Sequence, residues 1–261
     1  RLTRGQKLIN GCIMSAEELT FEILSDGAGM RKAVMREGKI EYDGALYDEL
    51  YFGSPTLSTM FAEPSFVIHN VTIGVNFHWE RQEVQTFAGA LKIVVSKGKL
   101  VAINVIGIED YLLSVISSEM SASADEEFLK AHAVISRSWV MARMTASDTL
   151  EVPVEIDSLP RLITWLYATR DVAVYTGDEY MKWYDHDDHK LFDVCADDHC
   201  QRYQGLSRAT GETVRKAIDA TWGQVLMHDG SLCDARFSKC CGGRMEAFST
   251  CWQDREYPYL L

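Results

Sequence analysis

The stretch from Glu109 to Met144, EDYLLSVISSEMSASADEEFLKAHAVISRSWVMARM, carries the clearest helical signals of the chain. Its first part, Glu109–Ser117, predicts a short helix. Ser123 followed by Glu126 has the spacing of a capping box, in which each side chain satisfies a backbone amide at a helix start. The residues that follow are rich in Ala, Leu, Met and Lys, so we predict a long helix from Ala124 to about Met144.

Strand-forming residues dominate the sequence before this stretch, over residues 1–105. Lys97-Gly98-Lys99 separates two apolar runs and predicts a hairpin turn, as Asp229-Gly230 does later in the chain. Between and after these we expect a strand at Val172–Tyr175 and helices at Ser158–Ala168 and Thr210–Thr221. The sequence therefore predicts an α+β fold with two intertwined lobes of mixed or antiparallel sheets, one long central helix and a cleft between the lobes.

The composition narrows the class of protein. Of the 261 residues, 47% are hydrophobic and 25% are charged, which suits a globular chain with a substantial core. The formal net charge is −12 and no basic face is evident, which argues against binding to nucleic acid. No apolar run approaches the roughly 18 residues of a membrane-spanning helix. The chain opens on Arg-Leu-Thr-Arg without a signal peptide, which fits a trimmed targeting segment.

Glu119 stands between the two predicted helices, after an apolar stretch and before Met120. Burial favours the neutral form of a carboxyl group, and a protonated carboxylic acid is what glycosidic cleavage needs at the leaving oxygen. An exposed loop carboxylate is the simpler interpretation of a lone Glu in this place. Residue type and position leave both interpretations open.

The long predicted helix carries two cations, Lys130 and Arg137, seven residues apart and therefore nearly on one face. Val134 and Met141 share that face. A mixture of long cations and apolar groups is compatible with a basic wall beside an acidic ligand. It is equally compatible with a solvated edge, on which Lys and Arg reach past apolar neighbours to water.

Six of the seven cysteines lie in the last third of the chain. His189, Cys195, His199 and Cys200 fall within a dozen residues, a donor set that suits zinc, whereas a Cys195–Cys200 disulfide or two unrelated thiols remain alternatives. A second group, Cys240-Cys241-Gly242-Gly243, allows a close backbone approach to a ligand or a tight turn with buried thiols. A disulfide from Cys240 or Cys241 to Cys251 is also compatible with the sequence.

Together these segments resemble the SpoIID/LytB domain over Phe87–Leu261. That family has a Glu-Met pair ahead of a helix of the form LKAQAVAARTYAL, which matches Glu119-Met120 and the segment LKAHAVISRSW at 129–139. The family then has CQ-Y-G and A-V-T-G segments, which match Cys200–Gly205 and Ala217–Gly223. A Gly-Gly motif follows, matched by Phe237–Gly243, and the family pattern closes on W and PYL, matched by Trp252 and Pro258–Leu260. Residues 1–86 match only loosely.

The resemblance implies a lytic transglycosylase that cleaves the bond between N-acetylmuramic acid and N-acetylglucosamine in peptidoglycan without using water. The implied catalytic residue is Glu119. The implied substrate-binding residues are Lys130, Arg137, Lys239 and Phe237. Zinc, expected to be structural, is implied at His189, Cys195 and Cys200, with His199 as the candidate fourth ligand. Implied partners are glycan strands already stripped of stem peptides and a cell-wall amidase, in an exported protein of the periplasm or cell envelope.

Three positions depart from the family pattern: Ser121 replaces the proline after the Glu-Met pair, Trp139 replaces a tyrosine, and Phe237 replaces the tyrosine before the Gly-Gly motif. The missing hydroxyl at Phe237 keeps a rival interpretation open, in which the chain binds glycan and enhances an amidase without catalysis. A zinc hydrolase of peptides or amides is a second rival, against which the absence of a His-Glu-x-x-His motif argues.

The organisation that we expect has two parts. Residues 1–86 form a β-rich part packed on the core, and residues 87–261 form the SpoIID-like catalytic domain. Within that domain, residues 146–188 exceed the length expected for the family and are predicted to be an insertion.

Overall fold

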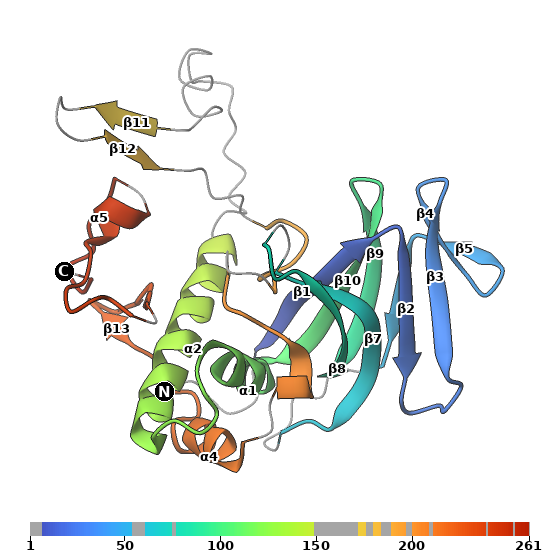
Figure 1. Cartoon of the computed structure of the whole chain (residues 1–261), viewed down its shortest axis with the longest axis horizontal. Coiled ribbons are helices and arrows are strands. Elements are labelled where there is room, and N and C mark those ends of the chain that lie inside the picture. The colour runs from blue at the N-terminus through green and yellow to red at the C-terminus, as the bar shows by residue number, and fades with distance from the viewer. Residues whose placement is uncertain are drawn as a thin grey trace.

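The fold is described from a computed structural model, shown in Figure 1. The structure describes residues 7–53, 61–74, 77–148, 172–175, 180–183, 189–196, 200–208, 211–238, 240–252 and 254–260. Two antiparallel sheets and a group of helices make up this part of the chain. The α+β class predicted from the sequence is therefore confirmed.

The smaller of the two main sheets is four-stranded, in the order β1-β10-β9-β6. Its strands are β1 (Leu8–Ala16), β6 (Glu49–Phe52), β9 (Ala90–Ser96) and β10 (Lys99–Gly107). Seven consecutive residues of β10 are buried, as expected for an inner strand covered on both faces. The turn between β9 and β10 has positive φ at Lys97 (49°) and Gly98 (74°), which is the two-residue hairpin turn predicted for this site.

The larger sheet is six-stranded, in the order β5-β4-β3-β2-β7-β8. Its strands are β2 (Glu18–Ile23), β3 (Met30–Arg36), β4 (Lys39–Tyr42), β5 (Ala45–Tyr47), β7 (Pro64–Ile73) and β8 (Arg81–Ala88). Buried and exposed residues alternate along β2, which is the pattern of a strand with one face on the core. The division predicted at residue 86 falls within β8, and it stays a prediction.

The helices group on one side of the sheets (Figure 1). They are α1 (Ile108–Glu119), the 23-residue α2 (Glu126–Asp148), η1 (Gly205–Arg208), α4 (Glu212–Ala220) and α5 (Phe248–Cys251). Two short hairpins pair β11 (Val172–Tyr175) with β12 (Tyr180–Trp183) and β13 (Met227–His228) with β14 (Ser231–Leu232). Of the helices in the described residues, none combines the length and hydropathy that a membrane span requires.

The start of α2 differs from the sequence interpretation. The carboxylate of Asp125 accepts the backbone N–H of Glu127 at 2.9 Å, so Asp125 caps the helix in place of the predicted Ser123. Ser123 instead bonds to Ser121, through its backbone N–H and its hydroxyl. Asp and Ser are both favoured helix caps, so composition alone did not separate them. The helix predicted at 158–168 lies outside the described residues, whereas the strand Val172–Tyr175 is confirmed.

A buried ion pair joins α1 to α2. Arg137 donates from Nε to Glu109 Oε1 at 2.9 Å and from a terminal nitrogen to Oε2 at 2.6 Å. Its other terminal nitrogen donates to the carbonyl of Gln224, and the backbone N–H of Gly223 donates to Glu109. The Arg137 side chain is 0% exposed. A charge at this depth is stable only because every side of it has a hydrogen-bonding partner.

We expect Arg137→Met to lower the free energy of unfolding by about 3–5 kcal/mol, because it leaves the Glu109 carboxylate buried without its cation. The double variant Glu109→Gln/Arg137→Met should recover much of this loss, since glutamine is neutral and still accepts from Gly223. Urea unfolding at pH 7 measures both. A loss below about 1 kcal/mol for the single variant would contradict the role given to this pair.

Asp110 is a second buried carboxyl group in α1. It accepts the backbone N–H of Ala62 at 2.7 Å. Burial raises the pKa of Asp110 to about 6 from its usual 3.8, although the Ala62 amide and Arg215 favour the charged form. Between about pH 4 and pH 6, the unfolded chain therefore loses this proton before the folded chain does. The contribution of Asp110 to stability falls as the pH rises through that window, by about 3 kcal/mol in total.

Asp110→Asn removes this titration while keeping an oxygen for the Ala62 amide. We expect the variant to match the parent at pH 4 and to exceed its unfolding free energy by about 2–3 kcal/mol at pH 7. Urea unfolding at the two pH values provides the comparison. A difference between the two proteins that does not change with pH would show that Asp110 is already ionised in the folded state.

Candidate functional site

Glu119 is the last residue of α1, and its side chain is half-buried. One carboxylate oxygen, Oε1, accepts the backbone N–H of Arg202 at 2.6 Å. The other oxygen accepts no hydrogen bond from the described residues. Arg202 lies 83 positions further along the chain, so a distant segment fixes the orientation of this carboxyl group. Such an arrangement holds one oxygen of the carboxyl group in place.

The segment that supplies this amide, residues 201–204, is tied to α1 at several other points. The Tyr111 hydroxyl donates to Gln201, whose side-chain amide donates to the carbonyl of Ser136 in α2. The backbone N–H of Gln204 donates to the Ser114 hydroxyl at 3.0 Å. A further bond runs from the buried Tyr203 hydroxyl to Asn104 in β10. The position of the Arg202 amide relative to Glu119 is therefore fixed on both sides.

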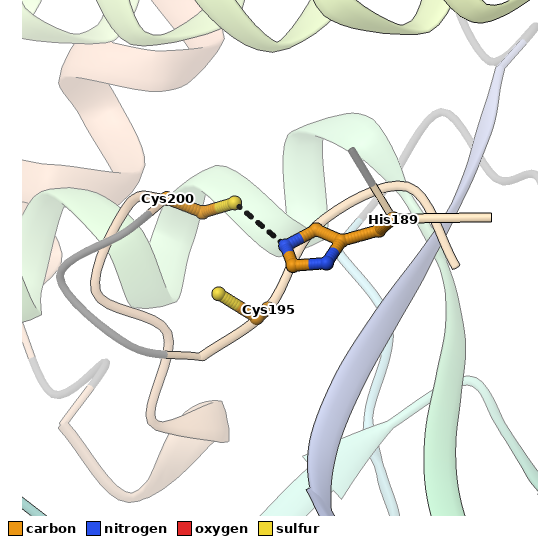
Figure 2. A group of neighbouring side chains, drawn as sticks. All are labelled: His189, Cys195 and Cys200. Carbon is orange, nitrogen blue, oxygen red and sulfur yellow. Dashed lines mark hydrogen bonds between the residues drawn. The ribbon is translucent and has the colours of Figure 1, made fainter. Parts of the chain in front are cut away.

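Immediately before this segment, His189, Cys195 and Cys200 come together, as Figure 2 shows. Their ligand atoms all lie within 4.8 Å of one another, and His189 Nε2 is 3.5 Å from Cys200 Sγ. Ligand atoms of tetrahedral zinc lie about 3.3–3.8 Å apart, and the separation of His189 Nε2 and Cys200 Sγ falls in this range. Two thiols and an imidazole are also the donor types that zinc prefers. The three residues predicted from the resemblance thus fit a metal ion.

The hydrogen bond to Cys195 is the largest cause that raises the pKa of the Cys200 thiol, and burial adds to it. The protein without metal therefore favours a protonated Cys200. A divalent cation would reverse this preference, because thiols bind zinc as thiolates. His199, the predicted fourth ligand, lies outside the described residues. The structure thus supports a His-Cys-Cys metal site with three protein ligands among the residues it describes.

The metal-site segment is anchored to the edge of the four-stranded sheet. Val194 forms an isolated parallel bridge with Gly11 of β1, and its carbonyl accepts the backbone N–H of Cys12. The Asp193 carboxylate accepts both the backbone and the side-chain N–H groups of Asn10, at 2.7 and 3.1 Å. The first strand of the chain therefore positions the segment that carries Cys195 and leads to Cys200.

The structure corrects the prediction that Arg137 lines a substrate groove. Its side chain has no exposed surface, and its guanidinium binds Glu109 and the carbonyl of Gln224. Lys130 and Arg137 are seven residues apart on α2, but the Arg137 side chain is buried whereas the Lys130 side chain is partly exposed. Lys130 is 25% exposed and pairs with Glu126 and Glu127 on its own helix. Lys239 lies outside the described residues.

Phe237 lies beside a buried histidine. Its ring meets the edge of His132 in α2, with ring centroids 4.8 Å apart and an angle of 85°. Phe128 lies nearly parallel to the same imidazole. Neither ring nitrogen of His132 has a hydrogen-bond partner among the described residues, and burial lowers the pKa of His132 to about 4. Phe237, in place of the family's tyrosine, thus packs against an imidazole whose neutral form is favoured by burial.

None of the seven cysteines forms a disulfide, so the alternatives of a Cys195–Cys200 bridge and of a bridge to Cys251 are not seen. Cys240, Cys241 and Cys251 are exposed, which also departs from the alternative of a tight turn with buried thiols. Sequence reasoning did not identify the Arg202 amide as a partner of Glu119. A backbone donor leaves no trace in residue type, and only its place next to Cys200-Gln201 pointed to the segment.

Comparison with known proteins identifies the family. The profile of SpoIID, stage II sporulation protein, matches residues 96–228, just over half of the chain. An uncharacterised protein of Brachyspira hyodysenteriae is 24% identical over 161 residues, which cover 62% of this chain. The aligned part is 33% of that relative, so the chain spans about a third of its length. No solved structure matches.

The match spans β10, α1, α2, the metal-site segment, residues 200–204 and α4, and it therefore includes every part that positions Glu119. The match links the chain to the cell-wall processes of sporulation. The chain belongs to the SpoIID family of stage II sporulation proteins.

Proposed function

We propose that this protein is a lytic transglycosylase of peptidoglycan that uses Glu119 as its single acid and base. The substrate is a glycan strand stripped of stem peptides, and the products carry 1,6-anhydro-N-acetylmuramic acid ends. The observation that carries the proposal is the carboxyl group of Glu119, half-buried at the end of α1 and oriented through Oε1 by the Arg202 amide. The protein is further proposed to act outside the cytoplasm, where its substrate lies.

The reaction needs one carboxyl group because the nucleophile belongs to the substrate. Glu119 gives its proton to the glycosidic oxygen as the bond from that oxygen to C1 of the muramic residue breaks. The carboxylate then accepts the proton of the muramic 6-hydroxyl, whose oxygen attacks C1 and closes the anhydro ring. Proximity favours this intramolecular attack over attack by water. The proton balance closes, since Glu119 ends the cycle protonated.

The same amide that orients Glu119 suits both halves of the cycle. A backbone N–H donating to Oε1 stabilises the carboxylate once the proton has left. The second oxygen is then the one that delivers and recovers the proton. Because a backbone donor cannot rotate away, the carboxyl group keeps one orientation through both steps.

Glu119→Gln is the direct test. Glutamine can still accept from the Arg202 amide but cannot exchange a proton, so we expect normal folding and a loss of about 10²–10⁴-fold in the release of anhydro ends. Mass spectrometry of products from peptide-free glycan strands provides the measurement. Glu212→Gln, an exposed substitution on α4, is the matched control.

If Glu119→Gln released anhydro ends at a rate within a few-fold of that of the parent protein, the proposal would be wrong. Products that carry reducing ends in place of anhydro ends would show hydrolysis and would replace the transglycosylase mechanism. Binding of glycan without any shortening by the parent protein would favour the role of an amidase enhancer.

We further propose that His189, Cys195 and Cys200 hold a structural zinc ion, with His199 as the fourth ligand. When bound, zinc supplies a cross-link between the segment attached to β1 and the segment that supplies the Arg202 amide. Arg202 follows Cys200 by two positions, so the ligand at residue 200 restrains the amide that orients Glu119. The role is positional, and no step of the reaction passes through the metal site.

We expect Cys195→Ser to lower the zinc content of the purified protein and its midpoint of thermal unfolding, because the free energy of metal binding contributes to folding. Cys251→Ser, which changes an exposed cysteine elsewhere, should change neither quantity. Metal analysis and thermal unfolding with and without a chelator measure the two effects. Zinc content that is the same in both variants would exclude this site.

A further inference from the structure

A polar cavity of about 340 Å³ lies beside Glu119 and takes no part in the mechanism above. Its walls come from the connection between β7 and β8, from the end of α1 and from the segment after Cys200. The lining residues are Ile73, Trp79, Arg81, Ser117, Ser118, Arg202 and Gln204. Ser118 directly precedes Glu119, and Arg202 supplies the amide that orients it. The volume is that of a small-ligand site.

The charge of this cavity opposes that of the whole chain. The formal net charge of the protein is −12, yet the described lining contains two arginines and no carboxylate. A pocket with cations on its walls attracts an anionic group. Guanidinium groups bind carboxylates in particular, because their planar N–H donors match the two carboxylate oxygens.

Trp79 holds the two guanidinium groups together. The Arg81 and Arg202 guanidinium carbons lie 5.9 and 6.0 Å from the centroid of its ring, within the range of cation–π attraction. The ring itself is fixed by Phe77, which stacks on it with a centroid distance of 5.3 Å. It also lies so close to Gly74 that a side chain there would overlap it. The two cations are therefore positioned before a ligand arrives.

Ser117, Ser118 and Gln204 also line the cavity. Ser117 Oγ and Ser118 Oγ are shielded from solvent and have no hydrogen-bond partner among the described residues. Buried polar groups without a partner are uncommon and cost free energy unless something binds them. Gln204 adds a side-chain amide to the same wall. A glutamine beside two arginines is a lining that suits a sugar that carries an acid.

We propose that this cavity is a subsite for a carboxylate-bearing sugar ring, in which Arg81 and Arg202 bind the carboxylate and determine specificity. The inference rests on the proposed function, since it places the acidic muramic residue of the glycan next to Glu119. Arg81 also pairs with Glu83 at 2.6 Å. The Arg81 side chain is 47% exposed and the Glu83 side chain 26%, and ion pairs near the surface are weak, so a ligand carboxylate can compete for the guanidinium group.

The test measures binding separately from cleavage. The full chain with Glu119→Gln is titrated calorimetrically with a peptide-free tetrasaccharide of alternating N-acetylglucosamine and N-acetylmuramic acid. A second probe is the same tetrasaccharide with its muramic carboxyl groups reduced to alcohols. Peptide-free sugars confine the carboxylates to the sugar rings, so stem-peptide acids cannot account for any binding.

Arg81→Gln and Arg202→Gln are introduced singly and together. We expect each to weaken binding of the acidic tetrasaccharide roughly tenfold, as the loss of one charge-assisted contact does. Binding of the reduced sugar should be weak from the start and should not respond to these substitutions. Arg36→Gln is the matched control, because Arg36 forms a similar exposed pair with Glu41 in a strand far along the same sheet. Thermal unfolding verifies that each variant is folded.

The subsite is overturned if the reduced sugar binds as tightly as the acidic one, if neither sugar binds, or if Arg81→Gln and Arg202→Gln bind like the control. The proposed function fails separately. If the parent protein releases no anhydro ends while the binding pattern is as expected, the subsite stands and the transglycosylase does not. If turnover is normal while the arginine substitutions have no effect on binding, the transglycosylase stands and the subsite does not.

Discussion

The buried pair between Arg137 and Glu109 is the constraint on which the helical part of this protein depends. It fixes how α1 packs against α2, and the same two side chains form hydrogen bonds with the backbone of the turn at Gly223–Gln224. Because α1 follows β10 directly, this one interaction also sets the direction in which the end of α1 leaves the sheet. Glu119 sits at that end. The chemistry proposed for Glu119 therefore depends on an ion pair that no ligand can reach.

Residues 200–204 connect the remaining features of the site. Cys200 belongs to the candidate metal site, the Arg202 amide orients Glu119, and Arg202 also lines the polar cavity. Residues 200–204 belong to no helix or strand, and this short stretch contacts three neighbours through a thiol, a backbone N–H and a guanidinium group. This arrangement brings the candidate metal ligands, the Glu119 carboxyl group and the polar cavity together on one short segment.

Much of the fold followed from local patterns, whereas most of the site did not. The turn at Lys97-Gly98 and the long helix after Asp125 are set by nearby residues, and the sequence predicted both, apart from the capping residue. The interior position of Arg137 depends on Glu109, 28 residues away, and helical spacing cannot distinguish a buried pair from a solvated edge. The cavity joins Trp79 to Arg202 across distant segments, and no local pattern indicates that contact.

The attachment of Asp193 to Asn10 spans 183 residues, and it has a consequence for the order of folding. β1 precedes the other described strands in the sequence, yet its sheet partner β10 comes about 90 residues later and its partner Val194 later still. Contacts between positions so far apart in the sequence form slowly, because closing the long loop between them costs conformational entropy before the contacts can stabilise the chain. The segment that carries Cys195, Cys200 and the Arg202 amide therefore reaches its place beside α1 and β1 only through contacts that span much of the chain.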